Sequence, residues 1–246
     1  MKLSIVMPAH NEEECLPSTL RGIVHRLDAE RVPHEIVVVN DHSTDGTERV
    51  LQALCAEYPT VRYLTNPGAP GYGLAVRAGL DAFTGDMVAV VMADGSDAPA
   101  DLVQYYRIIE QGYDCAFGSR FAKGSVVRGY PSHKLVLNRL ANFFIMALFG
   151  IRYNDVTNAF KCYRRTVIDG VRPILANHFN LTVELPLKAI ARGFTYAVVP
   201  IHWTSREAGL SKLKIKEMGS RYLFIVLYVF LERKLARGDY ARGQRS

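Results

Sequence analysis

The stretch VVMADGSDAP, residues 90–99, places two carboxylates and a hydroxyl directly after an apolar run. The run has the composition of a buried strand, and the polar sequence DGSD follows it. Mg²⁺ and Mn²⁺ prefer oxygen ligands, so Asp94 and Ser96, with Asp97 as a weaker contributor, are candidate ligands of such a cation. A plain polar turn uses the same residue types. The rest of the sequence has to distinguish these two readings.

Polar side chains also follow two earlier apolar runs. The sequence PAHNE, residues 8–12, comes after the first run, and Asp41 comes after the second. Rigid strand ends with such donors and acceptors suit a nucleotide base. A dinucleotide loop of the form G-x-G-x-x-G is missing, because Gly71 and Gly73 are followed by Val76 where the third glycine belongs. We therefore expect nucleotide binding without an NAD-type loop.

Cationic residues occur at two places in the second half of the chain. Arg120 ends the sequence GSR, and the sequence REAGLSK carries Arg206, Ser211 and Lys212. A guanidinium can bind a phosphate through two hydrogen bonds, and a lysine can bind it as a point charge. These residues are candidate phosphate ligands, although a salt bridge for Arg120 and a solvated charge for Lys212 stay open as alternatives.

The pattern of elements predicts an α/β fold. In the first 120 residues, apolar strands of four to seven residues alternate with amphipathic helices, the first of them over residues 12–30. Such alternation is typical of a mostly parallel, doubly wound sheet with helices on both faces, and ligands bind such sheets at the carboxyl ends of the strands. Further along, the sequence predicts helices over residues 134–150 and 180–194 and a strand over residues 195–203.

Several of these motifs together resemble the family-2 glycosyltransferases with the GT-A fold. The motifs are SIVMPAHNEEE, EIVVVNDHSTDGT, GYGLAVRAGLDAFTGDMVAVVMAD, FGSRF and REAGLSK, in the family's order and spacing. Within that family the chain is similar to the dolichol-phosphate mannose synthases and their bacterial polyprenyl-phosphate relatives. The resemblance covers residues 3–215. It implies an inverting transfer of a hexose, such as mannose or glucose, from a GDP- or UDP-linked donor to a polyprenyl or dolichyl phosphate.

The resemblance also assigns roles to individual residues. For the nucleotide sugar it implies contacts with Pro8, Ala9, Asn11, Glu12, Asp41, Gly71, Asp94 and Gly95. For the acceptor phosphate it implies Arg120, Lys134, Asn138, Arg206, Ser211 and Lys212. Catalysis is expected from Asp94, Arg120, Lys134 and Lys212. Lys134 and Asn138 stand where the family has an arginine and a serine. A loop with Asp155, Thr157 and Phe160, and the acid Glu184, match residues around the acceptor, where capping or buried hydrogen bonding is an equal alternative.

The sequence departs from the family at the metal motif. Family members carry D-x-D, whose two carboxylates share a divalent cation, whereas this chain reads Met92-Ala93-Asp94. A thioether is a poor ligand for Mg²⁺ or Mn²⁺. We expect a donor-assisted Mg²⁺ or Mn²⁺ site centred on Asp94.

The reaction chemistry separates three functions. A phosphate monoester is a nucleophile at neutral pH without a general base, because its second pKa is about 6, so cations suffice at such a site. Transfer to a hydroxyl of a glycan or glycolipid would need a carboxylate, for which Asp97 and Asp155 are the candidates. A nucleotide-binding scaffold without activity is the third reading. Processive family-2 synthases, which elongate polysaccharides, carry the motif Q-x-x-R-W. This motif is missing, because the single tryptophan, Trp203, lies in HWTSR, and a cellulose- or chitin-type synthase is therefore not expected.

Charge and cysteine content concern the location of the protein. Four dispersed cysteines suit a reducing compartment, and the first residues have no signal-peptide pattern. Residues 211–246 hold nine basic and three acidic side chains. The net charge of this segment, +6, is therefore as large as that of the whole chain. We expect a glycosyltransferase domain over residues 1–210 and a basic tail over residues 211–246. Within the tail, the ten apolar residues 222–231 are too few to span a bilayer alone.

The tail therefore predicts an interfacial helix. Its basic flanks favour an anionic leaflet. The alternatives are packing on the core or on a second copy in a homo-oligomer. Nucleic acid is not expected, because the aromatic residues of the tail alternate with aliphatic ones. These features predict a peripheral protein at the cytoplasmic face of a membrane.

Overall fold

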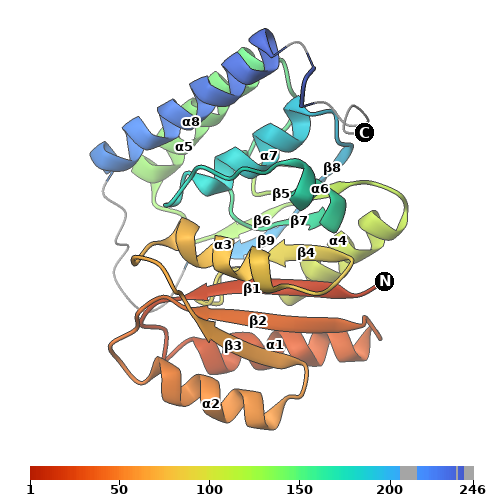
Figure 1. Cartoon of the computed structure of the whole chain (residues 1–246), viewed down its shortest axis with the longest axis vertical. Helices are drawn as coiled ribbons and strands as arrows, with labels where there is room; N and C mark the ends of the chain where they lie inside the picture. Colours follow the sequence, from red (N-terminus) through yellow and green to blue (C-terminus); the bar gives the residue numbers. More distant parts are fainter. Residues whose placement is uncertain (206–214, 237, 241–246) are drawn as a thin grey trace.

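The structure is a computed structural model, which describes residues 1–205, 215–236 and 238–240. Its centre is a seven-stranded sheet whose first four strands in space come from the first 90 residues (Figure 1). From one edge to the other, the strands are β3 (Val61–Thr65), β2 (His34–Asn40), β1 (Leu3–Ala9), β4 (Met87–Val90), β7 (Lys161–Arg164), β5 (Cys115–Ser119) and β8 (Tyr196–Pro200). Strand β7 is antiparallel to both neighbours, and the other pairs are parallel. The mostly parallel sheet is thus confirmed.

Helices cover both faces of the sheet, as the alternating pattern predicts. One face packs on α1 (Leu16–Ala29), α2 (Thr47–Glu57) and α4 (Pro99–Glu110). The other face packs on α3 (Tyr72–Ala82), α5 (Ser132–Phe149), α6 (Arg165–Gly170), α7 (Leu181–Ala191) and α8 (Ile215–Leu235). The side chains of β1 alternate between these faces, because successive residues of a strand point in opposite directions. Ile5 therefore lies in one core and Val6 in the other.

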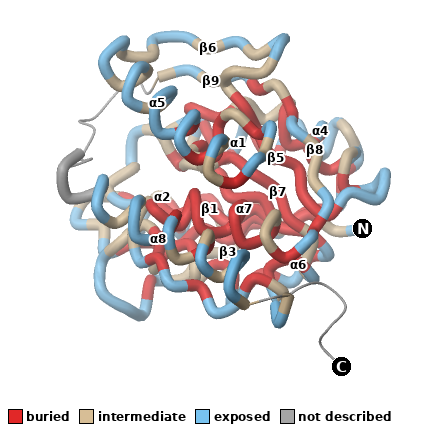
Figure 2. The backbone as a smooth tube through the Cα atoms, turned by 90° about the horizontal axis from the view of Figure 1, so that it is seen from above, coloured by how far each residue is buried: buried red, intermediate tan, exposed pale blue. Residues whose placement is uncertain are grey.

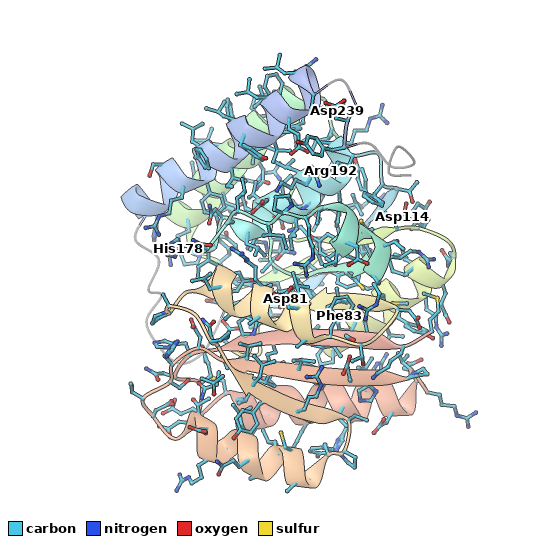
Figure 3. All side chains as sticks on the ribbon, viewed as in Figure 1. Asp81, Phe83, Asp114, His178, Arg192 and Asp239 are labelled. Atoms are coloured by element: carbon cyan, nitrogen blue, oxygen red, sulfur yellow. The ribbon has the colours of Figure 1, made fainter. Side chains whose placement is uncertain are left out.

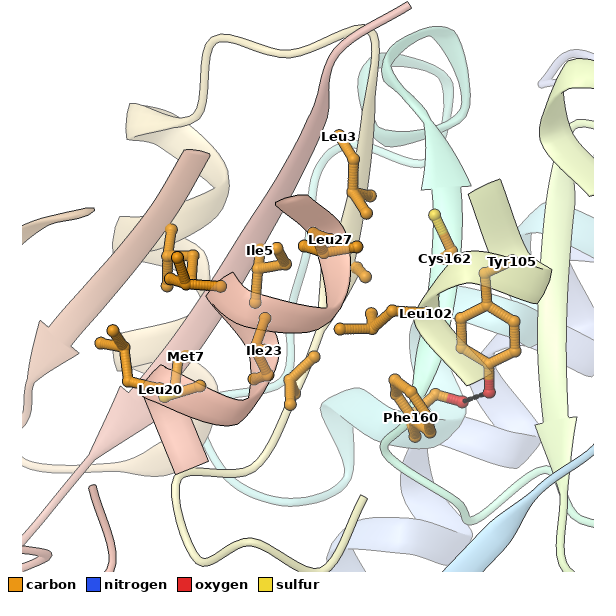
Figure 4. Close-up of a cluster of buried hydrophobic side chains, with 14 of the residues drawn as sticks. Leu3, Ile5, Met7, Leu20, Ile23, Leu27, Leu102, Tyr105, Phe160 and Cys162 are labelled. Atoms are coloured by element: carbon orange, nitrogen blue, oxygen red, sulfur yellow. Dashed lines mark hydrogen bonds between the residues drawn. The ribbon is translucent and has the colours of Figure 1, made fainter. Parts of the chain in front are cut away.

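The core under α1 shows how the apolar pattern fixes this layer. Leu20, Ile23 and Leu27 recur at helical spacing on one side of α1 and pack against Ile5 and Met7 of the sheet (Figure 4). Burial of such side chains contributes about 1.5–3 kcal/mol each. The packing holds the sheet rigid beneath the loops that follow its strands.

Two boundaries differ from the sequence prediction. Helix α1 begins at Leu16 rather than at residue 12, because the backbone N–H groups of Glu12 and Glu13 bond to the side chains of Thr47 and Asp45. The predicted strand over residues 195–203 is two strands. Ile201 separates β8 from β9 (His202–Thr204), which pairs in parallel with the exposed strand β6 (Val126–Arg128) at the periphery (Figure 2).

The C-terminal helix α8 is fastened to the domain by charged side chains. Arg192, at the end of α7, forms a two-pronged salt bridge with Glu232, at 2.9 and 3.0 Å (Figure 3). Arg233 donates a hydrogen bond of 2.6 Å to the carbonyl of Phe149 at the end of α5. Helices α5 and α8 thereby lie side by side (Figure 1). Among the described residues, no helix is both long enough and apolar enough to cross a bilayer.

Candidate functional site

The loops that follow β1, β2 and β4 meet at one edge of the sheet, because parallel strands end on the same side. The backbone N–H of Asp41 donates to the carbonyl of Ala9 at 2.8 Å, and the ring of His10 lies 2.6 Å from the carbonyl of Asp41. The loop after β1, with Pro8 and Ala9 at its start, is thus joined to the loop after β2. The structure brings both parts of the predicted base site together.

Asp41 organises the segment between β3 and α3. Its buried carboxylate accepts hydrogen bonds from the side-chain amide of Asn66, at 2.7 Å, and from the backbone N–H of Gly71, at 2.9 Å. Gly71 is needed there, because a Cβ would lie 2.9 Å from the carbonyl oxygen of Asn177. The carboxylate oxygens keep further lone pairs beyond these bonds. Base recognition by Asp41 stays a prediction.

The side chain of Asn11 joins the first two loops. Its side-chain amide oxygen accepts from the backbone N–H of Thr44 at 2.8 Å, and the backbone N–H of Asn11 donates to the hydroxyl of Ser43 at 3.0 Å. Asn11 has a φ of 56°, a left-handed conformation that asparagine tolerates well. Asp45 accepts from the N–H and the hydroxyl of Thr47, at 3.0 and 2.6 Å, in the turn that leads into α2.

The DGSD sequence forms a tight turn at the end of β4. Gly95 has a φ of 74°, and the carboxylate of Asp94 accepts from the N–H of Ser96 at 3.1 Å. The buried carboxylate of Asp97 folds back and accepts from the N–H of Met92 at 3.2 Å. Burial raises the pKa of the Asp97 carboxyl to about 7, and the nearby charge of Asp94 adds to this effect. The turn is therefore a compact acidic cluster.

The donor set of this turn fits a hard divalent cation. The carboxylate of Asp97 lies at the backbone N–H of Met92, the position at which family members carry the first acid of D-x-D. Ser96 adds a buried hydroxyl. In the described part of the chain, no three histidine, cysteine or acidic side chains converge as a metal cluster. A cation here would therefore use only part of its ligands from the protein, and Mg²⁺ typically takes the rest from phosphates and waters.

Arg120, at the end of β5, is held by Asp155. Its Nε and Nη2 donate to the two carboxylate oxygens at 2.8 and 2.7 Å, and its backbone N–H donates to the same carboxylate at 2.9 Å. The pair is buried, with side-chain exposures of 9% and 0%. Burial acts to lower the pKa of Arg120, but the charge and hydrogen bonds of Asp155 outweigh it and raise this pKa. The salt bridge that stood open as an alternative for Arg120 is thus present, and phosphate binding by its guanidinium stays a prediction.

Aromatic rings surround the outer side of this guanidinium. The rings of Phe121, Tyr130 and Trp203 lie 5.6, 5.2 and 5.8 Å from its central carbon. Trp203 also pairs with Asp97 through an isolated bridge of strand type. Through these contacts the β6–β9 sheet connects Arg120 with the DGSD turn. The predicted phosphate ligand thus lies next to the predicted metal ligands.

The first part of α5 contacts the loop before β7 through amide groups. Asn138 donates to the hydroxyl of Thr157 at 2.7 Å, and Asn142 donates to Asn138 at 2.8 Å. Asn138 is therefore part of a hydrogen-bonded network, and Lys134 lies one turn before it, half-buried. Whether the two contact an acceptor phosphate stays a prediction.

Two buried lysines stabilise the neighbouring loops. Lys161, directly after Phe160, donates to the carbonyls of Val156 and Thr182 at 3.0 and 3.1 Å, and burial lowers its pKa to about 7.

Glu184 accepts from the N–H groups of Leu175 and Ala176 at 2.8 and 2.7 Å, and Lys188 forms a salt bridge with it at 2.6 Å. For Glu184 the structure shows buried hydrogen bonding, which was one of the two expected alternatives.

Some expected site residues cannot be placed, and others were missed by the sequence analysis. Arg206, Ser211 and Lys212 lie outside the described residues. Asn66 was missed. It follows β3 just as Asp41 follows β2, so its position directly after a strand could have indicated it. Tyr130 gave no such signal, because only the fold places it beside Arg120.

Comparisons with known proteins identify the family. The polyprenol monophosphomannose synthase of Mycolicibacterium smegmatis is 34% identical over 215 residues, covering 85% of this chain and 80% of that protein. The dolichol-phosphate mannosyltransferase of Pyrococcus furiosus is 32% identical over 220 residues, covering 88% of this chain and 60% of that protein.

A solved structure with a similar fold is the glucosyl-3-phosphoglycerate synthase from Mycobacterium tuberculosis in complex with Mn²⁺, uridine diphosphate and glucosyl-3-phosphoglycerate. Its TM-score is 0.69 at 20% identity, covering 94% of this chain and 79% of that chain. This likeness confirms the expected GT-A fold. The model of glycosyl transferase family 2 matches residues 4–172, the segment that contains the DGSD turn and the Arg120–Asp155 pair, and the chain therefore belongs to that family.

Proposed function

We propose that this protein transfers a hexose from a GDP- or UDP-linked donor to a polyprenyl phosphate, with inversion at the anomeric carbon. Two relatives that share about a third of its residues are named for this kind of transfer. The observation that carries the proposal is the state of Asp155. This carboxylate is fully buried and accepts three N–H groups of Arg120, so it is not placed to remove a proton from an alcohol. A phosphate acceptor needs no such base.

Different residues are proposed to bind the nucleotide-sugar donor and the acceptor phosphate. Asp41 and the loop of Asn11 border the base, and the DGSD turn borders the diphosphate. Arg120 supplies a fixed positive charge that offsets the repulsion between the acceptor phosphate and the donor phosphates. Lys134, half-buried on α5, is proposed to bind the acceptor phosphate. Lys212 and Arg206 are proposed to add charge from the sequence REAGLSK.

A divalent cation is proposed to bind at Asp94, with Ser96 and Asp97 as further oxygen ligands. When bound, it would neutralise the charge that develops on the leaving diphosphate. The structural neighbours that bind Mn²⁺ together with uridine diphosphate support this proposal. Mn²⁺ and Mg²⁺ are both compatible with an all-oxygen donor set.

The apolar surface of α5 and α8 is proposed to lie on a membrane leaflet. Exposed apolar residues recur at helical spacing on α5, namely Val136, Leu137, Leu140, Phe143 and Phe144. A second such stripe on the adjacent α8 consists of Leu223, Phe224, Leu227 and Leu231. Exposed basic residues follow at Arg233 and Lys234. Such a surface suits an interfacial helix pair on anionic lipid, where a polyprenyl phosphate resides.

The proposed function is tested with the purified chain, labelled GDP-mannose or UDP-glucose, and vesicles that contain polyprenyl phosphate. We expect a lipid-extractable product that mild acid cleaves, and no product with the corresponding polyprenol. A thermal-shift panel of both donors with and without Mn²⁺ identifies the donor, because at equal concentration the ligand that binds the folded state more tightly stabilises it more. Transfer to no lipid phosphate from either donor would refute the proposal.

Transfer to a hydroxyl is the second candidate, and Asp97 favours it. Its carboxylate is buried beside the predicted donor site, and no salt bridge to it occurs among the residues placed by the structure. A product formed with polyprenol or a glycolipid, and lost on Asp97→Asn, would establish this alternative.

A further inference from the structure

Tyr72 occupies the first position of α3, between two parts of the proposed donor site. The preceding residue, Gly71, bonds to the carboxylate of Asp41. On its other side, the ring of Tyr72 stacks on Phe179, with the ring centres 4.1 Å apart and the planes 8° from parallel. Asn177 and His178, in the loop before α7, lie against the first turn of α3 (Figure 3). The side chain is therefore clamped in one orientation.

The hydroxyl of Tyr72 is buried, and no described residue provides it with a hydrogen-bond partner. It stands apart in this respect, because the buried hydroxyls of Tyr105 and Tyr153 donate to the carbonyls of Phe160 and Gly118. A tyrosine hydroxyl normally finds a partner when it is buried. Because the ring is held by its stacking on Phe179, a group that enters the site could supply the missing partner.

The surroundings of this hydroxyl restrict what that group can be. Burial raises the pKa of Tyr72, and the charges of Asp97 and Asp94 in the DGSD turn add to this rise, so the hydroxyl lies within the electrostatic reach of both carboxylates. Two carboxylates repel an anionic guest that lacks a cation. A neutral hydroxyl fits, because it can accept from the phenol and donate to a carboxylate at the same time.

We propose that the Tyr72 hydroxyl donates a hydrogen bond to a ring hydroxyl of the transferred sugar and so contributes to donor specificity. The proposal rests on the proposed function. It also explains why a polar side chain begins α3 on its buried side, where the apolar core of β1, α3 and α7 would accept phenylalanine.

The test is Tyr72→Phe, which keeps the stacking on Phe179 and removes only the oxygen. Calorimetric titration with Mn²⁺ present measures the affinity for the donor that stabilises the wild type, GDP-mannose or UDP-glucose. It also measures the free nucleoside diphosphate and a series of deoxy donors, each lacking one ring hydroxyl. We expect the variant to bind the intact donor about 5–10-fold more weakly and the diphosphate unchanged. One deoxy donor should bind equally to variant and wild type.

Tyr222→Phe is the matched control. The hydroxyl of Tyr222 donates to the carbonyl of Phe179 at 3.1 Å, so its removal should lower the melting temperature and leave the ratio of intact to deoxy donor unchanged. Tyr72→Phe with wild-type affinity for the intact donor, or with the same loss for every deoxy donor, would overturn the proposal. If the wild type binds neither sugar nucleotide, the proposed function fails and the assignment of Tyr72 fails with it.

Discussion

Glu35 and Asp97 are both buried carboxylates, but their surroundings shift their pKa values in opposite directions. Burial acts to raise the pKa of Glu35, yet hydrogen bonds from the Ser4 hydroxyl and from the N–H and hydroxyl of Thr84 outweigh it and lower this pKa to about 2. For Asp97, burial outweighs the longer bond from the N–H of Met92 and the charge of Arg120, and its pKa rises to about 7. The bonds to Glu35 favour its charged form in the fold, whereas a raised pKa such as that of Asp97 is common at functional sites and agrees with the role proposed for the DGSD turn.

The first prediction concerns Glu35→Gln. A lowered pKa means that the charged carboxylate stabilises the folded state above the unfolded value near 4.5, and that this contribution is lost as the pH falls toward 2. We expect the variant to be less stable by about 1–3 kcal/mol at pH 7 and the difference to shrink between pH 4.5 and pH 2.5. Urea unfolding at several pH values measures it. Glu57→Gln, in an exposed pair with Arg21, should change the midpoint little.

The second prediction concerns the metal ligands. Asp94→Asn should lower turnover by about 100-fold and abolish the donor-dependent binding of Mn²⁺ that electron paramagnetic resonance detects, because it removes a charged oxygen ligand. Asp86→Asn is the control, since Asp86 binds the N–H of Lys2 at the opposite end of β4. Unchanged Mn²⁺ binding in Asp94→Asn would show that the cation is held elsewhere.

At the scale of elements, the sequence predicts the strands whose ends form the donor side, because their apolar runs are continuous and buried. It misses the placement of β7, since a strand of four residues carries no signal of its direction. It also merges β8 and β9, because Ile201 continues the apolar pattern through the break. The acceptor side depends on these pairings, so Tyr130 and Trp203 could not be placed beside Arg120 from sequence.

The third prediction tests how the elements hold Arg120. Arg120→Lys keeps the charge but loses the two-pronged bond to Asp155, and we expect a stability loss of about 1–3 kcal/mol. Activity measured well below the melting temperature should fall by more than this loss explains, because the cation is no longer fixed. Thermal denaturation and initial rates measure both effects. Arg21→Lys, in an exposed two-pronged pair with Glu57, should change neither.

For the whole molecule, the sequence indicates a basic, apolar C-terminal helix but cannot tell which of its sides packs on the domain. The structure shows that Ile225, Val226 and Val229 face the core, whereas Phe224 and Leu227 are exposed beside α5. The outward stripe of α5 was not expected, because the sequence predicts a helix over residues 134–150 but does not show which of its sides is exposed. The two stripes together form a surface that neither helix provides alone.

The fourth prediction tests this surface as a whole. The double variant Phe143→Ser/Phe224→Ser should bind anionic vesicles at least about tenfold more weakly in co-sedimentation, because each exposed ring loses its apolar burial in lipid. Its rate with a short, water-soluble prenyl phosphate should stay near that of the wild type. Tyr113→Ser, exposed in the loop between α4 and β5, is the control and should leave vesicle binding unchanged. Equal vesicle binding by all three proteins would exclude this surface as the membrane contact.

The antiparallel strand β7 has a consequence for the order in which the chain becomes active during synthesis. Strands β1 to β4 are complete once the first 90 residues have left the ribosome, and they can pair among themselves. The position between β4 and β5 in the sheet stays empty until residues 161–164 are available, and the loop before this strand carries Asp155, the partner of Arg120. Domains fold as their segments emerge. The strands that carry the proposed donor residues can thus pair early, while the Arg120–Asp155 pair forms only after the chain has passed β5 and reached β7.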